Sequence, residues 1–319
     1  MMQNSNSSVI SYFILGAYLD IGIIRHLYFL IVILLYVVII LVNTSLIVLI
    51  SMNRSLHEPM YVLLCSLFVN ELYGSTALFP FLLIQTLSDV HTISVSFCFL
   101  QIFMVYSYAN IEFCTLAIMS YDRYLAICCP LQYNTRMTVN KVFMLVAAAW
   151  LYSFMKMLVL LSLNIPLTLC GNILKNFYCQ NYLIVKLACS DTKVNNIYGL
   201  FGIVITVLVP LIPILFSYIK ILQVCFSGSN QTRQKAVSTC TPHLASLLNF
   251  TFGCCFEILQ TRFDMTHVPR VLRIILSLYF LIIQPLMNPF MYGLQMSKIR
   301  ETFLFYYKVV ISERDAVKV

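Results

Sequence analysis

The sequence predicts an all-α membrane protein: a bundle of seven transmembrane helices followed by a short amphipathic helix. Hydrophobic residues make up 61% of the 319 residues and charged residues 10%, whereas soluble domains carry roughly 25% charge. Between Arg273 and Lys298, 24 residues pass without a charge. At about 1.5 Å per residue, a helix of that length crosses a hydrocarbon core about 30 Å thick.

Six further apolar runs fit the same length, and each holds at most one charged residue. In chain order the seven predicted spans are residues 27–50, 60–87 with Glu71, 94–119 with Glu112, 142–163 with Lys156, 194–218, 236–256 and 274–294. An odd number of spans puts the two termini on opposite sides of the membrane. We therefore expect an extracellular N-terminus over 1–26, a transmembrane domain over 27–296, and a cytoplasmic amphipathic helix and tail over 297–319.

The distribution of basic residues predicts the orientation. Twelve of the 20 lysines and arginines lie on the side that holds the C-terminus and eight on the other, where Lys156 is counted with an outer helix end. Cytoplasmic loops carry the excess of basic residues, so we expect the C-terminus inside and the N-terminus outside. The net charge of +8 is spread between apolar runs, so it does not indicate a nucleic-acid partner.

Four of the twelve cysteines lie on the predicted outer side, namely Cys98, Cys170, Cys179 and Cys189. Disulfides form in the oxidising extracellular space, and four cysteines allow three pairings. The other eight lie in spans or on the inner side, where we expect small buried hydrophobes. The N-terminal residues do not fit a cleaved signal peptide, and the sequon at Asn6 predicts glycosylation outside.

The seventh span ends in a tract that is unusual for a helix in lipid. Pro285 and Pro289 each lack the N–H that a helix needs, and Asn288 is polar. Such a segment is stable only where neighbouring helices satisfy the freed groups, so we expect a packed bundle with a bend here. Residues 298–308 are basic and aromatic, which predicts an amphipathic helix on the lipids of the inner leaflet.

Four motifs follow one another in the order and spacing of a known family. They are LHEPMY at 56–61, MSYDRYLAIC at 119–128, KAVSTCTPHL at 235–244 and NPFMY at 288–292. Over residues 25–310 the chain resembles a vertebrate olfactory receptor of the rhodopsin-like, G-protein-coupled class, and 70–75 and 256–260 look closer to fish receptors. The resemblance implies the disulfides Cys98–Cys179 and Cys170–Cys189, which would hold the second outer loop as a lid over a ligand cavity.

The resemblance also implies an activation switch at the inner end of the bundle. In the family's resting state Arg123 pairs with Asp122, and on activation it moves toward the G protein and a tyrosine of the fifth span. The alternative is an arginine that simply reaches water from a helix end. The implied switch residues are Asp122, Arg123, Tyr124, Tyr218, Asn288, the hinge Pro289, and Tyr292.

Glu71 and Glu112 are each the only acid in their span, and acids within the membrane are functional by default. The resemblance implies that both face the bundle interior near Asn43 and Asn288. Two neighbouring carboxylates cannot both ionise cheaply, so either a sodium ion lies between them or they share a proton. The alternative is two protonated acids hydrogen-bonded to Asn and Ser. Most relatives carry aspartate at position 71, which leaves a sodium geometry open; no other metal or cofactor is expected.

Ligands of such receptors lie between the outer halves of the third, fifth, sixth and seventh spans. The residues expected there are Val105, Tyr106, Ala109, Asn110, Gly202, Ile203, Thr206, Thr251, Cys254, Cys255 and Ile258. An apolar cavity with a few hydroxyls and an amide suits a small organic odorant. Four charged residues are expected to cluster near the outer mouth: Glu257, Arg262, Arg270 and Arg273. We expect a solvated rim there, and the alternative is that they attract charged, water-borne ligands.

We therefore expect a plasma-membrane odorant receptor that activates a stimulatory, olfactory-type heterotrimeric G protein and raises cyclic AMP. The alternatives are a rhodopsin-like receptor for a non-odorant ligand and a membrane transporter. The sequence lacks the aspartate near Val105 of an amine receptor, the seventh-span lysine of a retinal pigment, and the repeats of many transporters. No paired aspartates, Ser/His set or metal-ligand spacing indicates an enzyme.

Overall fold

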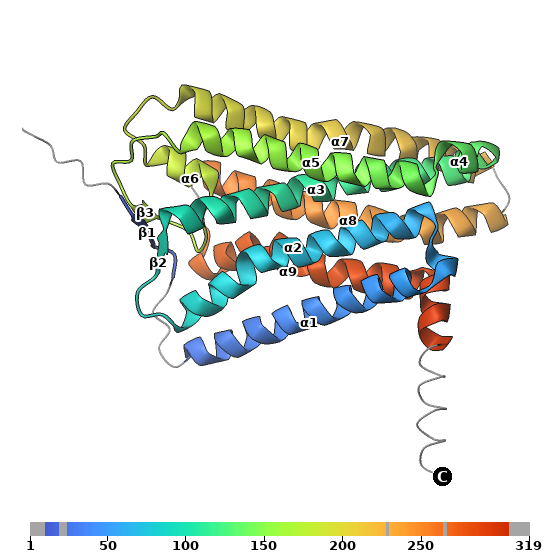
Figure 1. Cartoon of the computed structure of the whole chain (residues 1–319), viewed down its shortest axis with the longest axis horizontal. Coiled ribbons are helices and arrows are strands. Elements are labelled where there is room, and N and C mark those ends of the chain that lie inside the picture. The colour runs from blue at the N-terminus through green and yellow to red at the C-terminus, as the bar shows by residue number, and fades with distance from the viewer. Residues whose placement is uncertain (1–9, 19–23, 228–229, 264–266, 306–319) are drawn as a thin grey trace, which may run out of the picture.

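The computed structural model describes residues 10–18, 24–227, 230–263 and 267–305, so the sequon at Asn6 lies outside it. The chain forms an elongated bundle of helices (Figure 1). Within the described residues seven helices are long and apolar enough to cross a membrane, which confirms the predicted fold class. They are α1 (Ile24–Met52), α2 (Pro59–Leu87), α3 (Val95–Cys128), α5 (Val139–Asn164), α7 (Lys193–Ser227), α8 (Asn230–Arg262) and α9 (Arg270–Gln295).

The helices extend beyond the apolar runs that predicted them. The helix α7 begins at Lys193 and α3 continues to Cys128. Polar and charged residues near a helix end can reach water without interrupting the backbone hydrogen bonds. Hydrophobicity therefore located each span correctly but underestimated its length.

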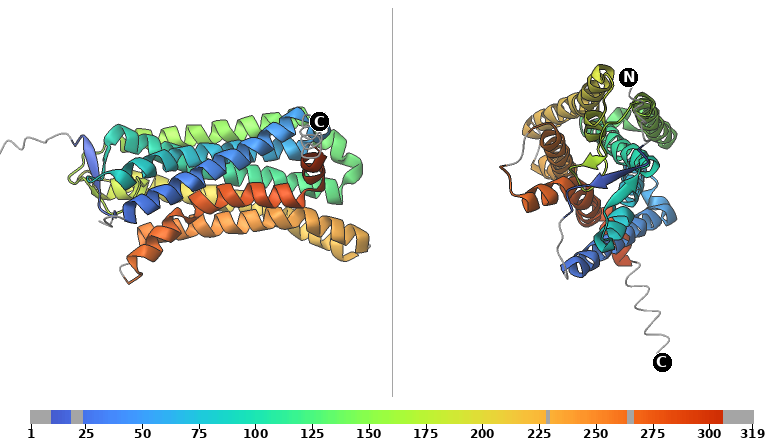
Figure 2. Two further views of the ribbon diagram at one scale, coloured as in Figure 1. Left: turned by 90° about the horizontal axis from the view of Figure 1, so that it is seen from below. Right: turned by 90° about the vertical axis from the view of Figure 1, so that its left-hand side faces the viewer.

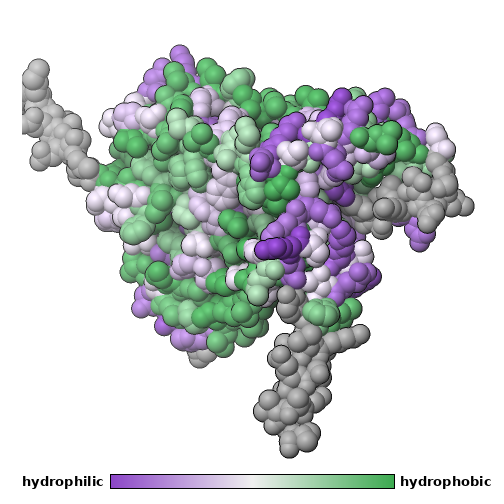
Figure 3. All heavy atoms as spheres, turned by 45° about the vertical axis from the view of Figure 1, so that its right-hand side comes forward, coloured by the Kyte–Doolittle hydropathy of each residue, from purple (hydrophilic) through white to green (hydrophobic). Residues whose placement is uncertain are grey.

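The helix α3 lies at the centre of the bundle, where it contacts α2, α5, α7 and α8 (Figures 1 and 2). Its buried residues extend from Cys98 to Leu125. The outer helices α1, α5 and α7 expose most of their apolar side chains. Figure 3 shows apolar side chains over the flank and polar ones gathered around the end of the bundle nearer the viewer. An apolar flank of this extent suits a lipid environment.

Short helices and capping residues shape the turns between the spans. A 3₁₀ helix, η1 (Arg54–Leu56), joins α1 to α2, and α4 (Pro130–Arg136) joins α3 to α5. Proline begins both α2 and α4, where its missing N–H removes no helical hydrogen bond. The Ser94 hydroxyl caps α3 by accepting from the Phe97 N–H at 3.3 Å.

A small sheet, which no sequence pattern predicted, covers the end of the bundle opposite α4. The strand β1 (Tyr12–Leu15) lies between β2 (Thr92–Ser94), to which it is antiparallel, and β3 (Ile173–Leu174), to which it is parallel (Figure 2). Strands of two to four residues are too short to show an alternating pattern. Their pairing joins segments far apart in the chain, which no local signal reports.

Two disulfides fix the loop between α5 and α7 on the same end. Cys98 at the start of α3 pairs with Cys179, with Cα atoms 5.4 Å apart, and Cys170 pairs with Cys189 at 5.6 Å. This is the pairing that the resemblance implies. The loop also carries the short helix α6 (Asn181–Lys186). The loop, α6 and the sheet together form a lid over the bundle.

The freed backbone carbonyl in α9 has the interhelical partner that the sequence analysis required. Pro289 lacks an N–H, so the Pro285 carbonyl four residues earlier loses its helical donor. The side-chain amide of Asn43 in α1 donates to this carbonyl at 2.9 Å and to the Ile39 carbonyl at 2.9 Å. Asn43 is completely buried. The proline is therefore tolerated because a neighbouring helix replaces the missing donor.

A helix over 297–305 follows α9 and turns away from the bundle axis (Figure 1). Ile299 is buried against the bundle, whereas Phe303, Leu304 and Phe305 are exposed. Lys298 forms an exposed ion pair with Glu58 before α2. The predicted amphipathic helix is present as far as 305, and its expected last three residues lie outside the described part.

Replacing Asn43 by leucine tests the contact between α1 and α9. Asn43→Leu leaves the Pro285 carbonyl buried without a donor, so we expect a loss of about 1–3 kcal/mol in stability. Thermal unfolding of the purified receptor would measure it. Ser45→Ala is the matched control, because the Ser45 hydroxyl is exposed and bonds only the Leu41 carbonyl of its own helix. Equal unfolding temperatures for the two variants would contradict this role of Asn43.

Candidate ligand-binding site and switch residues

A cavity of about 130 Å³ lies under the lid, between α3, α5, α7 and α8. Its walls are mostly apolar, with Val105, Met157, Leu160, Ile203 and Ile258 among them. Tyr178, Gln180, Asn181 and Tyr182 close it from the outer loop and α6. A small apolar cavity with a few placed polar groups is typical of a site for a small organic molecule.

Nine of the eleven residues expected to contact a ligand line this cavity: Val105, Tyr106, Ala109, Asn110, Gly202, Ile203, Thr206, Cys254 and Ile258. Thr251 and Cys255 are not among its lining residues. Thr251 lies almost one turn deeper than Cys254 on α8, and Cys255 points about 100° away from it. Ligand contact by any of these residues remains a prediction.

The helices around the cavity differ from the expected set. In the described part of the chain, the lining residues come from α3, α5, α7, α8 and the outer loop with α6, and none comes from α9. The fourth span and the outer loop therefore contribute to the cavity, and the seventh span does not. The disulfide Cys98–Cys179 draws this loop down onto α3, where Gln101 also accepts from the Cys179 N–H at 2.9 Å. Sequence spacing within one helix could not report this contact.

Lys156 of α5 lies at the deep end of the cavity, so counting it with the outer helix ends was wrong. Its ammonium donates to the Asn110 side-chain oxygen at 2.9 Å, to the Gly202 carbonyl at 2.9 Å, and to the Thr206 hydroxyl. The sequence did contain a signal, because Lys156 is the only charged residue of its predicted span. A lone charge within a span indicates a functional group facing the interior.

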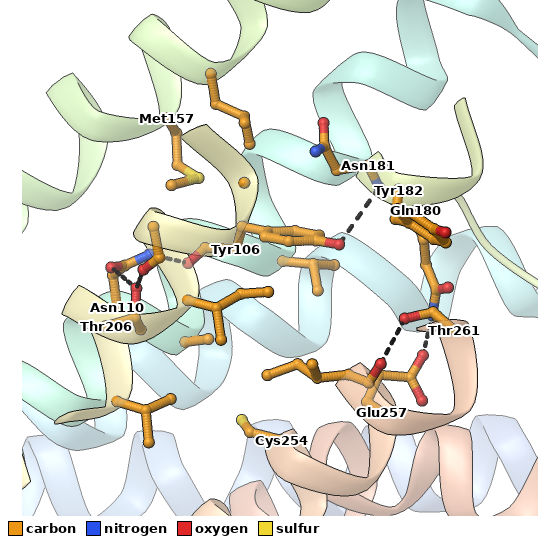
Figure 4. Close-up of a pocket in the computed structure, with 18 of the residues that line it drawn as sticks. Tyr106, Asn110, Met157, Gln180, Asn181, Tyr182, Thr206, Cys254, Glu257 and Thr261 are labelled. Atoms are coloured by element: carbon orange, nitrogen blue, oxygen red, sulfur yellow. Dashed lines mark hydrogen bonds between the residues drawn. The ribbon is translucent and has the colours of Figure 1, made fainter. Parts of the chain in front are cut away.

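Glu257 of α8 lies at the outer end of the cavity, opposite Asn110 and Thr206 (Figure 4). It is only 8% exposed, so the prediction of a solvated rim was wrong for this residue. Its carboxylate accepts from the Tyr178 hydroxyl and the Gln180 amide of the lid, from the Ser277 hydroxyl at 2.8 Å, and from the Gln260 amide at 2.9 Å. The carboxylate therefore ties the lid to α8 and α9.

Two tyrosines and an arginine make further contacts at the outer end of the cavity. Burial and the Glu257 carboxylate raise the pKa of Tyr178, so its hydroxyl keeps the proton that it donates. The Tyr106 side chain extends across the cavity, and its hydroxyl accepts from the Asn181 N–H at 3.3 Å (Figure 4). Arg262 lines the outer mouth with its guanidinium 4.0 Å above the Tyr182 ring. The side chains of Arg270 and Arg273 lie outside the described part of the chain.

A layer of buried polar residues lies deeper in the bundle, around the two acids of α2 and α3. Glu71 and Glu112 are both completely buried. Asn288 of α9 donates to both carboxyl groups, at 3.1 Å in the case of Glu112. The Tyr108 hydroxyl donates to Glu71 at 2.9 Å, and the Asn70 amide donates to Glu112 at 2.9 Å. Both acids therefore face the interior of the bundle and share Asn288 as a donor, as the resemblance implies.

Two details add to the expectation for this layer. Asn43 was expected near the acids, and the two hydrogen bonds that its amide donates go to backbone carbonyls of α1 and α9. Gln284 was not expected, and it donates to Glu112 at 3.1 Å and to the Ser246 hydroxyl at 2.9 Å. An amide is attracted either to a carboxylate or to a carbonyl freed by proline, and only the packing decides which one it reaches.

Gly74 makes room for this layer. A Cβ atom built at Gly74 would lie 2.4 Å from Cδ2 of the Tyr108 ring. Real Cβ atoms do not approach so closely, so glycine is what lets the Tyr108 ring pack on α2 and direct its hydroxyl to Glu71.

At the inner end of α3, Arg123 donates to the Asp122 carboxylate, and the Tyr133 hydroxyl of α4 donates to the other oxygen of Asp122 at 2.9 Å. The Asp122 side chain is fully buried and that of Arg123 is 13% exposed. Burial and the Asp122 carboxylate raise the pKa of Tyr133, so this hydroxyl stays protonated. The arrangement is the resting pair that the resemblance implies.

His243 holds the tyrosine of the fifth span, which sequence reasoning missed. Its Nε2 is 2.9 Å from the Leu116 carbonyl, and its Nδ1 contacts the Tyr218 hydroxyl. Because a carbonyl only accepts, Nε2 carries the proton, and in the neutral ring Nδ1 accepts from Tyr218. The hydroxyl of Tyr218 on α7 is therefore bound to His243 of α8. Tyr292 is completely buried nearby on α9, and Tyr124 packs against Phe216 with ring centres 6.0 Å apart.

Seven transmembrane helices, a lidded cavity, and a buried Asp–Arg pair at the opposite end define a seven-helix membrane receptor. The sequence model of the olfactory receptor family matches residues 32–308. Human olfactory receptor 10A6 is 33% identical over 305 residues, which cover 95% of this chain and 96% of that relative. Mouse olfactory receptor 4B13 is 31% identical over 267 residues, 83% of this chain and 86% of that relative. The chain belongs to the olfactory receptor family, whose members are multi-pass proteins of the plasma membrane.

Replacing Gly74 tests the packing of the buried layer. In Gly74→Ala the new methyl group collides with the Tyr108 ring, and overpacking of this kind costs about 1–3 kcal/mol. We expect a lower unfolding temperature and less receptor at the cell surface. Gly293→Ala is the control, because its Cβ would lie 3.7 Å from the Leu46 side chain, an ordinary contact. A Gly74→Ala receptor as stable as Gly293→Ala would show that the Tyr108 contact is not restrictive.

Proposed function

We propose that this chain is an odorant receptor that couples to a stimulatory, olfactory-type heterotrimeric G protein and raises cyclic AMP. The N-terminus would be extracellular and the C-terminus cytoplasmic, in the plasma membrane of sensory neurons. The observation that carries the proposal is that one helix joins the two ends. Val105 and Asn110 of α3 line the cavity, and Asp122 and Arg123 lie on the same helix, roughly 20 Å deeper at about 1.5 Å per residue.

Ligand binding would act as a population shift between two bundle geometries. A molecule in the cavity contacts α3, α5, α7 and α8 at once, so it favours the geometry in which these helices fit around it. In the active geometry Arg123 would leave Asp122, and Tyr218 would leave His243 and turn toward Arg123. The inner ends of α3, α7 and α8 would then admit the α-subunit of the G protein.

The buried polar layer would take part in this change. Asn288 bridges Glu71 and Glu112 and lies next to Pro289, so a bend of α9 at the proline moves an amide that holds both acids. Two ionised carboxylates around one amide would repel each other. Either a sodium ion or a shared proton would therefore stabilise the resting layer, and both would be lost when the layer rearranges.

The orientation and the lipid contacts have separate support. The disulfides Cys98–Cys179 and Cys170–Cys189 lie at the end of the bundle that holds β1, and disulfides persist outside the cell. The helix over 297–305 exposes apolar side chains and carries Lys298 and Arg300, which suits the anionic lipids of the inner leaflet. Asn6 would then be an extracellular glycosylation site.

Cyclic AMP in cells that display this chain with an olfactory G-protein α-subunit tests the proposal. A panel of acids, alcohols, amines, amino acids and steroids would be applied, and we expect a dose-dependent rise for some members. The variant Asp122→Ala with Arg123→Ala, at equal surface density, should lose the response because the inner switch is removed. A response that this variant keeps in full would contradict the coupling mechanism.

A further inference from the structure

The deep end of the cavity holds a positive charge among neutral partners. All three oxygen atoms that accept from the Lys156 ammonium belong to uncharged groups: the Asn110 amide, the Gly202 carbonyl and the Thr206 hydroxyl. A charge in a low-dielectric interior is stabilised far better by an opposite charge than by neutral dipoles. The site would therefore gain most from a ligand that brings a negative charge.

At the other end of the cavity, the hydrogen-bond positions of the Glu257 carboxylate are already filled by donors from the protein. A carboxylate has about four acceptor positions, and Glu257 accepts from four donors, namely Tyr178, Gln180, Gln260 and Ser277. A ligand ammonium would have to displace one of them and loosen the lid. Arg262, the second basic residue that lines the cavity, adds to the preference for an anion over a cation.

We propose that the ligand is a small monocarboxylate whose carboxylate is bound by Lys156 at the deep end of the cavity. This inference rests on the proposed function, in which the cavity holds the activating ligand. One carboxylate oxygen takes the place of the Thr206 hydroxyl as acceptor from the Lys156 ammonium. In this structure the Thr206 hydroxyl directs its proton to the Gly202 carbonyl at 2.7 Å or to the Asn110 side-chain oxygen at 2.9 Å. On binding it turns this proton to the carboxylate, so both groups recognise the same anion.

The size and walls of the cavity set the rest of the ligand. A cavity of about 150 Å³ with apolar walls holds a benzene molecule, and the cavity here measures about 130 Å³. Above Lys156 the walls are formed by Val105, Met157, Leu160 and Ile203. The body of the ligand is therefore apolar and about as large as one six-carbon ring or chain.

Binding of size-matched probes to the purified full-length receptor in lipid nanodiscs tests this assignment. The probes are benzoate and hexanoate, with benzyl alcohol, hexanol, benzylamine and hexylamine as partners of similar size. Ligand-induced thermal stabilisation measures affinity without a G protein. We expect at least one carboxylate to bind about ten- to a hundred-fold more tightly than its alcohol and amine, the range for one charge-assisted hydrogen bond.

Three variants separate the role of the charge from that of the fold. Lys156→Gln should lower carboxylate affinity by about the same factor and leave alcohol binding nearly unchanged, which also shows that the cavity is intact. Lys156→Arg should keep the preference for carboxylates. Lys193→Gln, at an exposed lysine at the start of α7, should behave as the unmodified receptor.

The outcomes distinguish this inference from the proposed function. It is overturned if neither carboxylate binds, if an alcohol or amine binds as tightly as the carboxylate, or if Lys156→Gln keeps full carboxylate affinity. An alcohol or amine that raises cyclic AMP while carboxylates do not bind would overturn the anion site and leave the receptor function intact. A carboxylate that binds through Lys156 without raising cyclic AMP would support the anion site and contradict the coupling.

Discussion

Lipid offers no hydrogen-bond partner, and this constraint governs the whole bundle: each buried polar group has to find its partner inside the protein. The contact between Asn43 and the Pro285 carbonyl is the simplest case, because it replaces the donor that Pro289 removes. The layer around Glu71 and Glu112 is the largest case, and it joins α2, α3 and α9 through Asn288. Helices that share such partners cannot move independently, which is what a receptor requires of its resting state.

The central helix α3 carries these contacts from one end of the molecule to the other. Cys98 attaches its outer end to the lid, Asn110 meets Lys156 in the cavity, and Glu112 belongs to the buried layer. Asp122 and Arg123 follow at the inner end. Under the proposed function, a ligand that alters the packing around Asn110 would act on a helix that also holds these other contacts.

The lid closes the outer end of the cavity beside that helix. The strand β1 pairs with both neighbouring outer segments, and Glu257 bonds Tyr178 and Gln180 from below. The cavity is thus small, with Lys156 at its deep end and Glu257 at its outer end. Its selectivity would follow from charge at Lys156 and from the apolar volume between the ends.

The sequence by itself determined the seven spans, the family, and nine of the residues that line the cavity, because lipid imposes long uncharged runs and the motifs lie at fixed spacing within single helices. Only the tertiary structure decided which polar groups meet. It placed Lys156 and Glu257 in the cavity instead of at the expected helix end and rim, directed the Asn43 amide to the Pro285 carbonyl, and brought β1 between two distant segments. These contacts join different helices, and a partner on another helix depends on how the helices rotate and pack, which periodicity along one segment does not report.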